Sequence, residues 1–265
     1  LLLTEAEKAR VKGVIINKFR GDIKILEPGI KMLEDIIKVP VLGVIPYTRL
    51  NIEDEDSLAE RFNQKMDANC METDIAVIKL PHISNFTDFN ALENINGARV
   101  RYVERAEDLG NPDMVILPGS KNTIEDLLFV RKSGIENAIY RLYRAGTVIF
   151  GICGGYQMLG TEIADPFHTE SNIEKIAGIG LLNMKTVFRK EKVTTQVKAS
   201  ITGNDGILEG LDGTVVEGYE IHMGTTEYLE GCSPYLTISS VLGQHAVKVD
   251  GVRNGDVLGT YIHGI

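Results

Sequence analysis

Alternation between apolar runs and helix-like stretches organises the start of the chain. An apolar, β-branched run at 11–17 precedes a stretch at 25–38 with apolar residues at helical spacing, and a second apolar run follows at 41–46. Strand, helix and strand in this order predict a βαβ unit with a parallel sheet. From residue 51 to 71 the chain turns polar, with an acidic run at 53–56 that we interpret as a solvated linker. We therefore expect a domain boundary near residue 70.

The second segment repeats the α/β pattern. Apolar runs predict strands near 74–80, 99–103, 113–117 and 147–152, and helical patterns lie near 86–95, 122–131, 134–145 and 155–163. This alternation favours an α/β fold with an open, mostly parallel sheet. Beyond Gly178, short alternating runs separated by glycines predict antiparallel strands and hairpins added to that sheet. We expect two parts, residues 1–70 and 71–265.

Composition narrows the class of protein. The 265 residues are 43% hydrophobic, which is enough for a substantial core, and the formal net charge is −9. An acidic chain without a Lys/Arg cluster between aromatics argues against a nucleic-acid partner. No apolar run reaches the roughly 18 residues of a membrane span, and the start lacks a basic signal-peptide region. We therefore expect a cytoplasmic protein with no membrane contact.

Both ends of the chain are unusual. It starts with Leu1 rather than Met, and it stops at Ile265, within an expected strand and its exit loop. We therefore expect a fragment of a longer polypeptide, truncated at its C-terminus.

Cys153 is the most informative residue. An apolar run at 148–152 leads directly into it, and Gly154, Gly155 and a helix-like stretch follow. This pattern predicts a nucleophile elbow on a sharp strand-to-helix turn, where glycines relieve backbone strain. The start of the helix is expected to favour thiolate over thiol. The other cysteines, Cys70 and Cys232, lie far apart without metal-ligand spacing, and we expect them to be buried apolar residues and no metal to be bound.

A thiol nucleophile needs a base and donors for the negative charge that develops on the attacked carbonyl. His263 ends the strand-like run 257–262, which would bring its ring to the sheet edge where Cys153 lies. The backbone N–H of Gly154 is one candidate oxyanion donor. Gly119, after the buried strand at 115–117, is a second candidate, although such a turn also occurs as a simple connection.

Six segments together resemble the cobyric acid synthase family: NKFRGD at 17–22, LPHISNFTDF at 80–89, LPGSKNT at 117–123, GICGGYQMLG at 151–160, GYEIHMG at 218–224 and GTYIHG at 259–264. They occur in the right order and cover nearly the whole chain. The resemblance implies a class I glutamine amidotransferase domain preceded by the tail of an ATP-binding P-loop domain related to dethiobiotin synthetase. This family takes ammonia from glutamine and amidates side-chain carboxylates of adenosylcobyrinic acid a,c-diamide in cobalamin biosynthesis.

The resemblance also implies cofactors and partners. ATP and Mg²⁺ would serve the full-length enzyme, L-glutamine and a corrinoid acceptor would be its substrates, and an N-terminal ATP-binding domain would be missing here. No G-x-x-x-x-G-K-[ST] phosphate loop occurs in the sequence. The chain alone is therefore expected to be a glutaminase at most, with no cofactor of its own, and 17–22 to be a remnant of the ATPase.

The family's site residues carry over as follows. Cys153 would be the nucleophile that forms a glutamyl thioester, and His263 the general base and acid. Gly119 and Gly154 would supply oxyanion N–H groups, and Gln157 would hold the substrate glutamine. No carboxylate stands two residues after His263, unlike the wider class I pattern, so we expect a Cys–His dyad whose imidazole is oriented by a backbone carbonyl or water.

Four further polar residues have open roles. Strand alternation puts Glu220 and His222 on one face as a possible polar pair, for which a structural or substrate-facing role is favoured over catalysis. His82 and Asp88 follow a strand in a polar-aromatic loop. They would either face the corrinoid acceptor or cap the helix near Phe89.

Other functions remain open from the sequence. A cobyrinic acid a,c-diamide synthase and the glutaminase subunit that amidates peptidoglycan precursors share the elbow. Segments 17–22 and 221–224 argue against the first, and the ATPase remnant argues against the second. A protein of another class, a cysteine peptidase or DJ-1-type hydrolase, has a similar elbow. A glutamine hydrolysis assay would distinguish it from an amidotransferase. A non-catalytic binding module is the last alternative.

Overall fold

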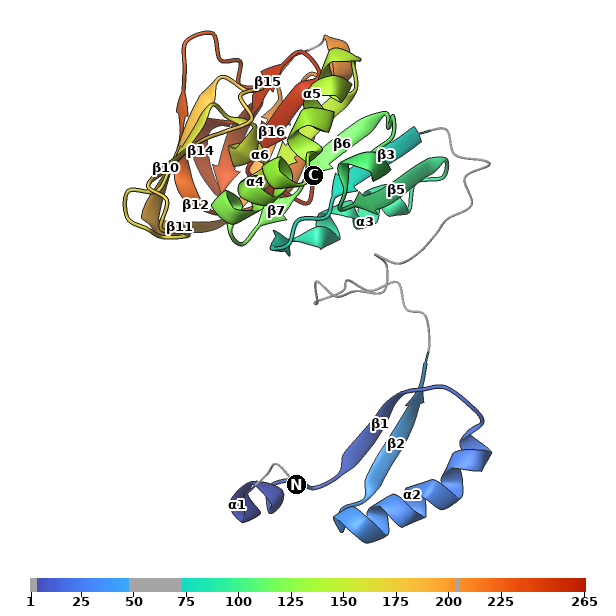
Figure 1. The fold of residues 1–265 in the computed structure, drawn as a ribbon. Helices are drawn as coiled ribbons and strands as arrows, with labels where there is room; N and C mark the ends of the chain where they lie inside the picture. Colours follow the sequence, from blue (N-terminus) through green and yellow to red (C-terminus); the bar gives the residue numbers. More distant parts are fainter. Residues whose placement is uncertain (1–3, 48–72, 204) are drawn as a thin grey trace. The chain divides into compact units, whose positions relative to one another are not determined.

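The computed structural model describes residues 4–47, 73–203 and 205–265. The chain divides into two compact units, residues 1–52 and 53–265, which we describe separately (Figure 1). The expected boundary near residue 70, the acidic run at 53–56 and Cys70 all lie outside the described residues. None of the described helices is long and apolar enough to cross a lipid bilayer.

The first unit contains the expected βαβ arrangement. A short helix α1 (Glu5–Lys8) precedes strand β1 (Val14–Phe19), helix α2 (Ile23–Ile37) and strand β2 (Val41–Pro46), and the two strands pair in parallel. Helix α2 begins after Asp22, whose carboxylate accepts a hydrogen bond from the Lys24 N–H at 2.9 Å. Segment 17–22 spans the end of β1 and this cap, and its assignment to an ATPase stays a prediction.

The second unit is built on a six-stranded sheet in the order β15-β16-β8-β6-β3-β5. Five strands are parallel and β15 is antiparallel at the edge. The strands are β3 (Thr73–Ile78), β5 (Ala98–Val103), β6 (Met114–Leu117), β8 (Val148–Ile152), β15 (Val252–Asn254) and β16 (Val257–Thr260). The predicted open, mostly parallel sheet is therefore confirmed, with strand bounds within two residues of those expected.

Helices α4 (Thr123–Lys132), α5 (Ile135–Arg144) and α6 (Gly154–Leu159) accompany this sheet, with 3₁₀ turns at η4 (Ala106–Asp108) and η5 (Gly206–Leu208). Two helix predictions were too long. The helix expected at 86–95 is a 3₁₀ turn, η3 (Phe86–Phe89), followed by α3 (Asn90–Glu93). Helix α6 ends at Leu159 because the carbonyls of Met158 and Leu159 accept N–H groups from residues 179–182, and strand β9 (Glu162–Ala164) follows.

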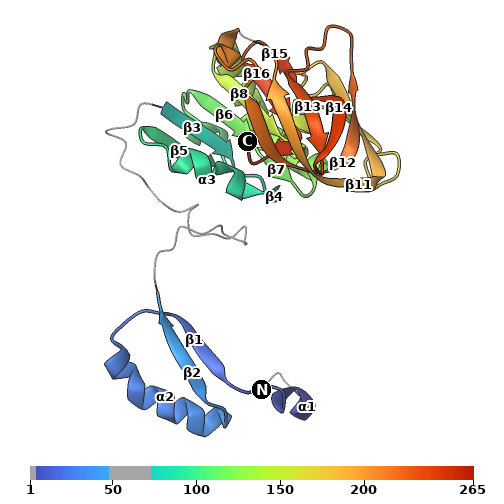
Figure 2. The same ribbon diagram turned by 180° about the vertical axis from the view of Figure 1, so that it is seen from behind.

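A second, largely antiparallel sheet lies beside the first (Figure 2). It contains β9, β10 (Lys175–Ala177), β11 (Met184–Ile201), β12 (Val215–Tyr228), β13 (Leu236–Val241), β14 (Gln244–Asp250) and β17 (Ile262–His263). Antiparallel strands were expected here, but β11 and β12 are 18 and 14 residues long rather than short. Because β17 pairs with β12, this sheet carries His263 to the end of the central sheet, where Cys153 lies.

Candidate active site

Cys153 occupies a strained turn between β8 and α6. Its φ of 50° and ψ of −105° lie outside the regions that residues with a side chain usually adopt. The expected strain is thus present, but the cysteine itself carries it, since Gly151, Gly154 and Gly155 do not have positive φ. Gly155 is needed for a different reason: the turn leaves no room for a side chain there, because a Cβ would lie 1.9 Å from the carbonyl oxygen of Leu117.

The Cys153 thiol is 7% exposed, and burial raises its pKa to about 12 despite a hydrogen bond from the Gly154 N–H. The Sγ atom lies 3.4 Å from the carbonyl oxygen of Ile221, to which the thiol donates. The expectation that the turn favours thiolate was therefore wrong for this state. Loss of water around the sulfur outweighs the effect of one N–H and a six-residue helix. The thiol needs a base.

His263 lies completely buried at the end of β17 and faces Asp88. Its Nδ1 is 2.7 Å from Asp88 Oδ2, and the N–H of Gly264 donates to Asp88 Oδ1 at 3.1 Å. Within the described part of the chain, His263 Nε2 is buried and has no hydrogen-bond partner. An imidazole that donates from Nδ1 to the carboxylate leaves Nε2 free to accept a proton.

Asp88 therefore replaces the backbone carbonyl or water that we expected to orient His263. It also replaces the expected helix cap, since the hydrogen bonds of Asp88 go to residues 263 and 264 and not to a helix N-terminus. The alternative that Asp88 faces the corrinoid acceptor stays a prediction. The loop that contains Asp88 also contacts the imidazole indirectly, through Tyr219. The Tyr219 ring stacks on the His263 ring with centroids 5.1 Å apart, and Asn85 Nδ2 donates to the Tyr219 hydroxyl at 2.8 Å.

His82 lies in the same loop but has a different partner. Its Nδ1 is 2.9 Å from Asp126 Oδ1, whose other carboxylate oxygen accepts from the Ser120 hydroxyl at 2.5 Å. Asp126 is completely buried. A short antiparallel pair, β4 (Ile83–Ser84) with β7 (Gly119–Ser120), joins the same two segments. His82 thus braces the loop that contains Gly119, and it lies apart from the Asp88–His263 pair.

Gly119 and Gly154 belong to two segments that meet at the elbow. A Cβ on Gly119 would be 3.3 Å from His263 Cε1, and a Cβ on Gly154 would be 2.9 Å from the backbone nitrogen of Ser120. A side chain at Gly154 would thus collide with backbone, and one at Gly119 would have little room, because the loop after β6 packs against the elbow. Cys153, His263 and these two glycines converge, while the oxyanion role of the glycines stays a prediction.

Gln157 lies one turn after Cys153 and is 2% exposed. Its Nε2 donates to the Tyr261 hydroxyl at 3.3 Å, and its Oε1 accepts from the Thr123 hydroxyl at 3.2 Å. The amide thus belongs to a buried hydrogen-bond network that reaches the start of α4. Its expected role in holding glutamine stays a prediction.

The expected Glu220–His222 pair is replaced by two other contacts. Glu220, 2% exposed, binds Lys248 Nζ at 2.6 Å. His222 stacks on Tyr261 at 3.9 Å between ring centroids, and its Nδ1 is 3.0 Å from the carbonyl oxygen of Gly224. Burial lowers the pKa of His222 to about 4, so its ring is neutral at physiological pH. A structural role fits both residues.

Sequence reasoning missed Glu170. Its Oε2 accepts the Thr123 N–H at 2.7 Å, at the first residue of α4. Burial raises the pKa of Glu170 to about 7, and its negative charge contributes to the raised pKa of Cys153. No motif marked this residue, because its proximity to the elbow arises only from folding of the 165–171 loop.

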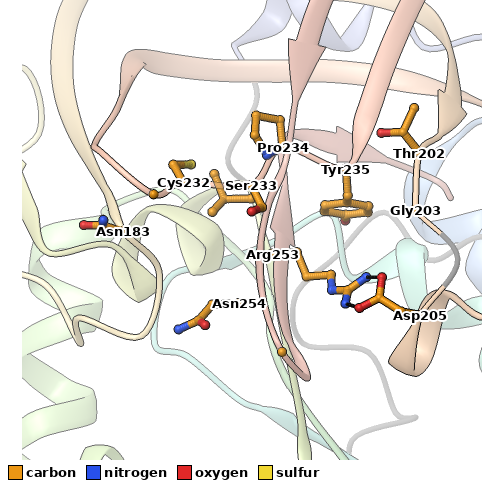
Figure 3. Close-up of a pocket in the computed structure, with 13 residues that line it drawn as sticks. Asn183, Thr202, Gly203, Asp205, Cys232, Ser233, Pro234, Tyr235, Arg253 and Asn254 are labelled. Atoms are coloured by element: carbon orange, nitrogen blue, oxygen red, sulfur yellow. Dashed lines mark hydrogen bonds and ion pairs between the residues drawn. The ribbon is translucent and has the colours of Figure 1, made fainter.

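A separate pocket of about 500 Å³ contains none of the predicted site residues (Figure 3). Arg253 and Asp205 form an ion pair in its wall, and Cys232 lies at its edge. The pocket adjoins the start of β16, whereas Cys153 pairs with the end of that strand. The pocket therefore lies near the start of the parallel strands, whereas the elbow lies near their carboxyl ends. Among the described residues, no three His, Cys, Asp or Glu side chains gather as a metal site.

Comparison with known proteins identifies the family. The CobB/CobQ-like glutamine amidotransferase domain matches residues 74–265. The cobyric acid synthase of Alkaliphilus metalliredigens is 52% identical over 271 residues, covering 100% of this chain and 53% of that protein. The cobyric acid synthase of Clostridium tetani is 54% identical over 267 residues, covering 100% of this chain and 51% of that protein. The chain thus spans about half the length of these curated relatives.

Solved structures agree on the fold. A chain in the structure of PurLQS from Thermotoga maritima superposes with a TM-score of 0.56 and 23% identity, covering 73% of this chain and 88% of that one. A structure described as a glutamine amidotransferase gives a TM-score of 0.53 and 20% identity over 72% of this chain and 89% of that one. The expected class I glutamine amidotransferase fold is confirmed.

Proposed function

The chain belongs to the CobB/CobQ-like glutamine amidotransferase family, and we propose that it is the glutamine-hydrolysing part of a cobyric acid synthase. The observation that carries the proposal is the buried arrangement of Cys153 on its elbow, His263 whose Nε2 has no partner among the described residues, and Asp88 on Nδ1. The three side chains have the roles of a nucleophile, a general base and a group that orients the base.

The reaction begins when Cys153 Sγ attacks the side-chain carbonyl carbon of glutamine. A C–S bond forms, the thiol proton passes to His263 Nε2, and the carbonyl electron pair moves to oxygen. The N–H groups of Gly119 and Gly154 receive this negative charge. Asp88 holds the imidazolium that forms, at 2.7 Å from Nδ1. Because burial raises the pKa of the Cys153 thiol to about 12, removal of its proton by His263 is essential.

The tetrahedral intermediate then collapses. The C–N bond breaks, His263 Nε2 returns its proton to the leaving nitrogen, and ammonia departs from a glutamyl thioester on Cys153. Water, deprotonated by His263, attacks the thioester, and the thiolate leaves and regains the proton. The sum is glutamine and water to glutamate and ammonia.

The acceptor step belongs to the complete protein. The sequence has no phosphate loop and the described residues gather no metal-binding group, so we propose no ATP- or Mg²⁺-dependent step for them. We assign ATP-dependent activation of carboxylates on adenosylcobyrinic acid a,c-diamide to the remaining half that the relatives contain. The proposed enzyme would work in the cytoplasm, which supplies ATP and glutamine.

The relatives support this assignment over the alternatives. Both cobyric acid synthases match the whole chain, including the βαβ unit that a free-standing glutaminase subunit would not carry. Membership of an amidotransferase family argues against a peptidase or DJ-1-type hydrolase.

The test uses the full-length protein with adenosylcobyrinic acid a,c-diamide and ATP. Wild type should amidate the acceptor with either glutamine or ammonium chloride as nitrogen source. Cys153→Ala should lose the glutamine-dependent reaction and keep the ammonia-dependent one. Cys232→Ala is the matched control and should keep both. Glutamine-dependent amidation by Cys153→Ala, or no amidation by wild type with either source, would overturn the proposal.

A further inference from the structure

Glu170 accepts a hydrogen bond at the start of α4, and the loop at 165–171 holds it there. The completely buried Asp165 accepts the Glu170 N–H at 2.9 Å, the Ser171 N–H at 3.2 Å, and both the N–H and the hydroxyl of Thr169 at 2.8 Å. Four hydrogen bonds to one carboxylate hold the backbone of this loop in one conformation. The position of Glu170 is thus determined before any substrate arrives.

A short chain of contacts joins Glu170 to the nucleophile. Thr123 donates its N–H to Glu170 Oε2 at 2.7 Å and its hydroxyl to Gln157 Oε1 at 3.2 Å. The same hydroxyl would lie 3.2 Å from a Cβ on Gly154, the residue after Cys153. One residue, Thr123, therefore separates the Glu170 carboxylate from the elbow. The negative charge of Glu170 acts on the sulfur, since it contributes to the raised pKa of Cys153.

A carboxylate that only Thr123 separates from the elbow suits an amino acid whose side-chain amide lies on Cys153. An extended glutamine places its α-nitrogen about 5 Å from the side-chain carbonyl carbon, by ordinary bond lengths. We propose that Glu170 binds the α-ammonium group of the substrate glutamine and so selects an α-amino acid over other primary amides. The inference rests on the proposed glutaminase function and adds a substrate-recognition residue to it.

Charge compensation gives this carboxylate a role in substrate binding. Glu170 is mostly buried, one residue away from the elbow, and forms no ion pair in the described structure, which is costly for an anion. An ammonium group at this place supplies the missing positive charge. It also cancels a negative field that disfavours ionisation of Cys153. Substrate binding and activation of the thiol are thereby coupled.

The competing role for Glu170 is only to cap α4, and the substitution Glu170→Gln separates the two. The amide oxygen of glutamine still accepts the Thr123 N–H, so the cap is kept while the charge is removed. The full-length protein is assayed with glutamine and with glutaramate, which is glutamine without its α-amino group. Wild type should have a kcat/KM at least 10-fold higher for glutamine. In Glu170→Gln the kcat/KM for glutamine should fall about 10- to 100-fold, while that for glutaramate changes little.

Glu170→Asp retains the charge and should recover part of the preference for glutamine. Glu174→Gln is the matched control, since this side chain in the same loop is 79% exposed, and it should behave as wild type. Equal use of glutamine and glutaramate by wild type would overturn the inference without any variant. So would a Glu170→Gln enzyme that slows equally on both substrates. In either case glutamine hydrolysis by wild type would leave the proposed function standing.

Discussion

Replacing Asp88 by asparagine tests whether the carboxylate on His263 is part of the machinery. The two charge centres of an Asp88–imidazolium pair lie roughly 4 Å apart, which corresponds to about 4 kcal/mol of attraction at an effective dielectric constant of 20. Both side chains are nearly inaccessible to water, at 5% and 0% exposure, so screening is weak. Asparagine keeps a hydrogen bond to Nδ1 but not the charge. We expect about 3 kcal/mol of transition-state stabilisation to be lost.

That loss corresponds to a decrease of about 100-fold in kcat for glutamine hydrolysis. The KM should change less than threefold, because Asp88 contacts the base and not the substrate. The assay is steady-state glutamate release by the full-length protein, with thermal unfolding to verify that the variant is folded. Asp108→Asn is the control, since Asp108 is half exposed and pairs with Arg105 at the surface. A folded Asp88→Asn enzyme with kcat within threefold of wild type would refute the reasoning.

Three further outcomes are expected. Without glutamine, alkylation of Cys153 should accelerate about tenfold per pH unit from pH 7 to 10 without reaching a plateau, because the thiol pKa is about 12; a plateau below pH 9 would contradict this. Gly155→Ala should lower the free energy of unfolding by more than about 2 kcal/mol in urea titrations, since its Cβ would collide with Leu117; a loss below 1 kcal/mol would show that the turn adapts. His222 has a lowered folded pKa of about 4, so its contribution to stability is present above pH 6.5 and is lost as pH falls toward 4. His222→Phe, which retains stacking on Tyr261, should flatten this dependence, and an unchanged slope would exclude His222 as its source.

Local pattern was enough for most of the fold. Strands β3, β6 and β8 follow from runs of four or five apolar residues, because strands buried on both faces need a continuous apolar run. The end of α6 at Leu159 could not be predicted in this way. Its final carbonyls bind N–H groups near residue 180, and this contact depends on the path of a distant loop.

The same distinction between local pattern and distant contacts applies to the candidate site. The elbow at Cys153 is a local feature, since strand, glycines and helix follow one another in the sequence. The partner of His263 is not local, because Asp88 lies 175 residues earlier in the chain and the residue two positions after the histidine is Ile265, which has no carboxylate. The strand pattern likewise predicted that Glu220 pairs with His222. In the structure its carboxylate binds Lys248 from β14 instead.

The sequence alone predicted Cys153 as the nucleophile, and it indicated the order of strands and helices and the likeness to an amidotransferase family. These depend on residues close together in the chain, where spacing translates directly into local geometry. Only the tertiary structure decided which carboxylate orients His263, where Glu170 lies, and that the thiol is protonated at rest. Each of these depends on burial and on contacts between distant segments, since the energy of a charge depends on the water it has lost and the groups that replace it.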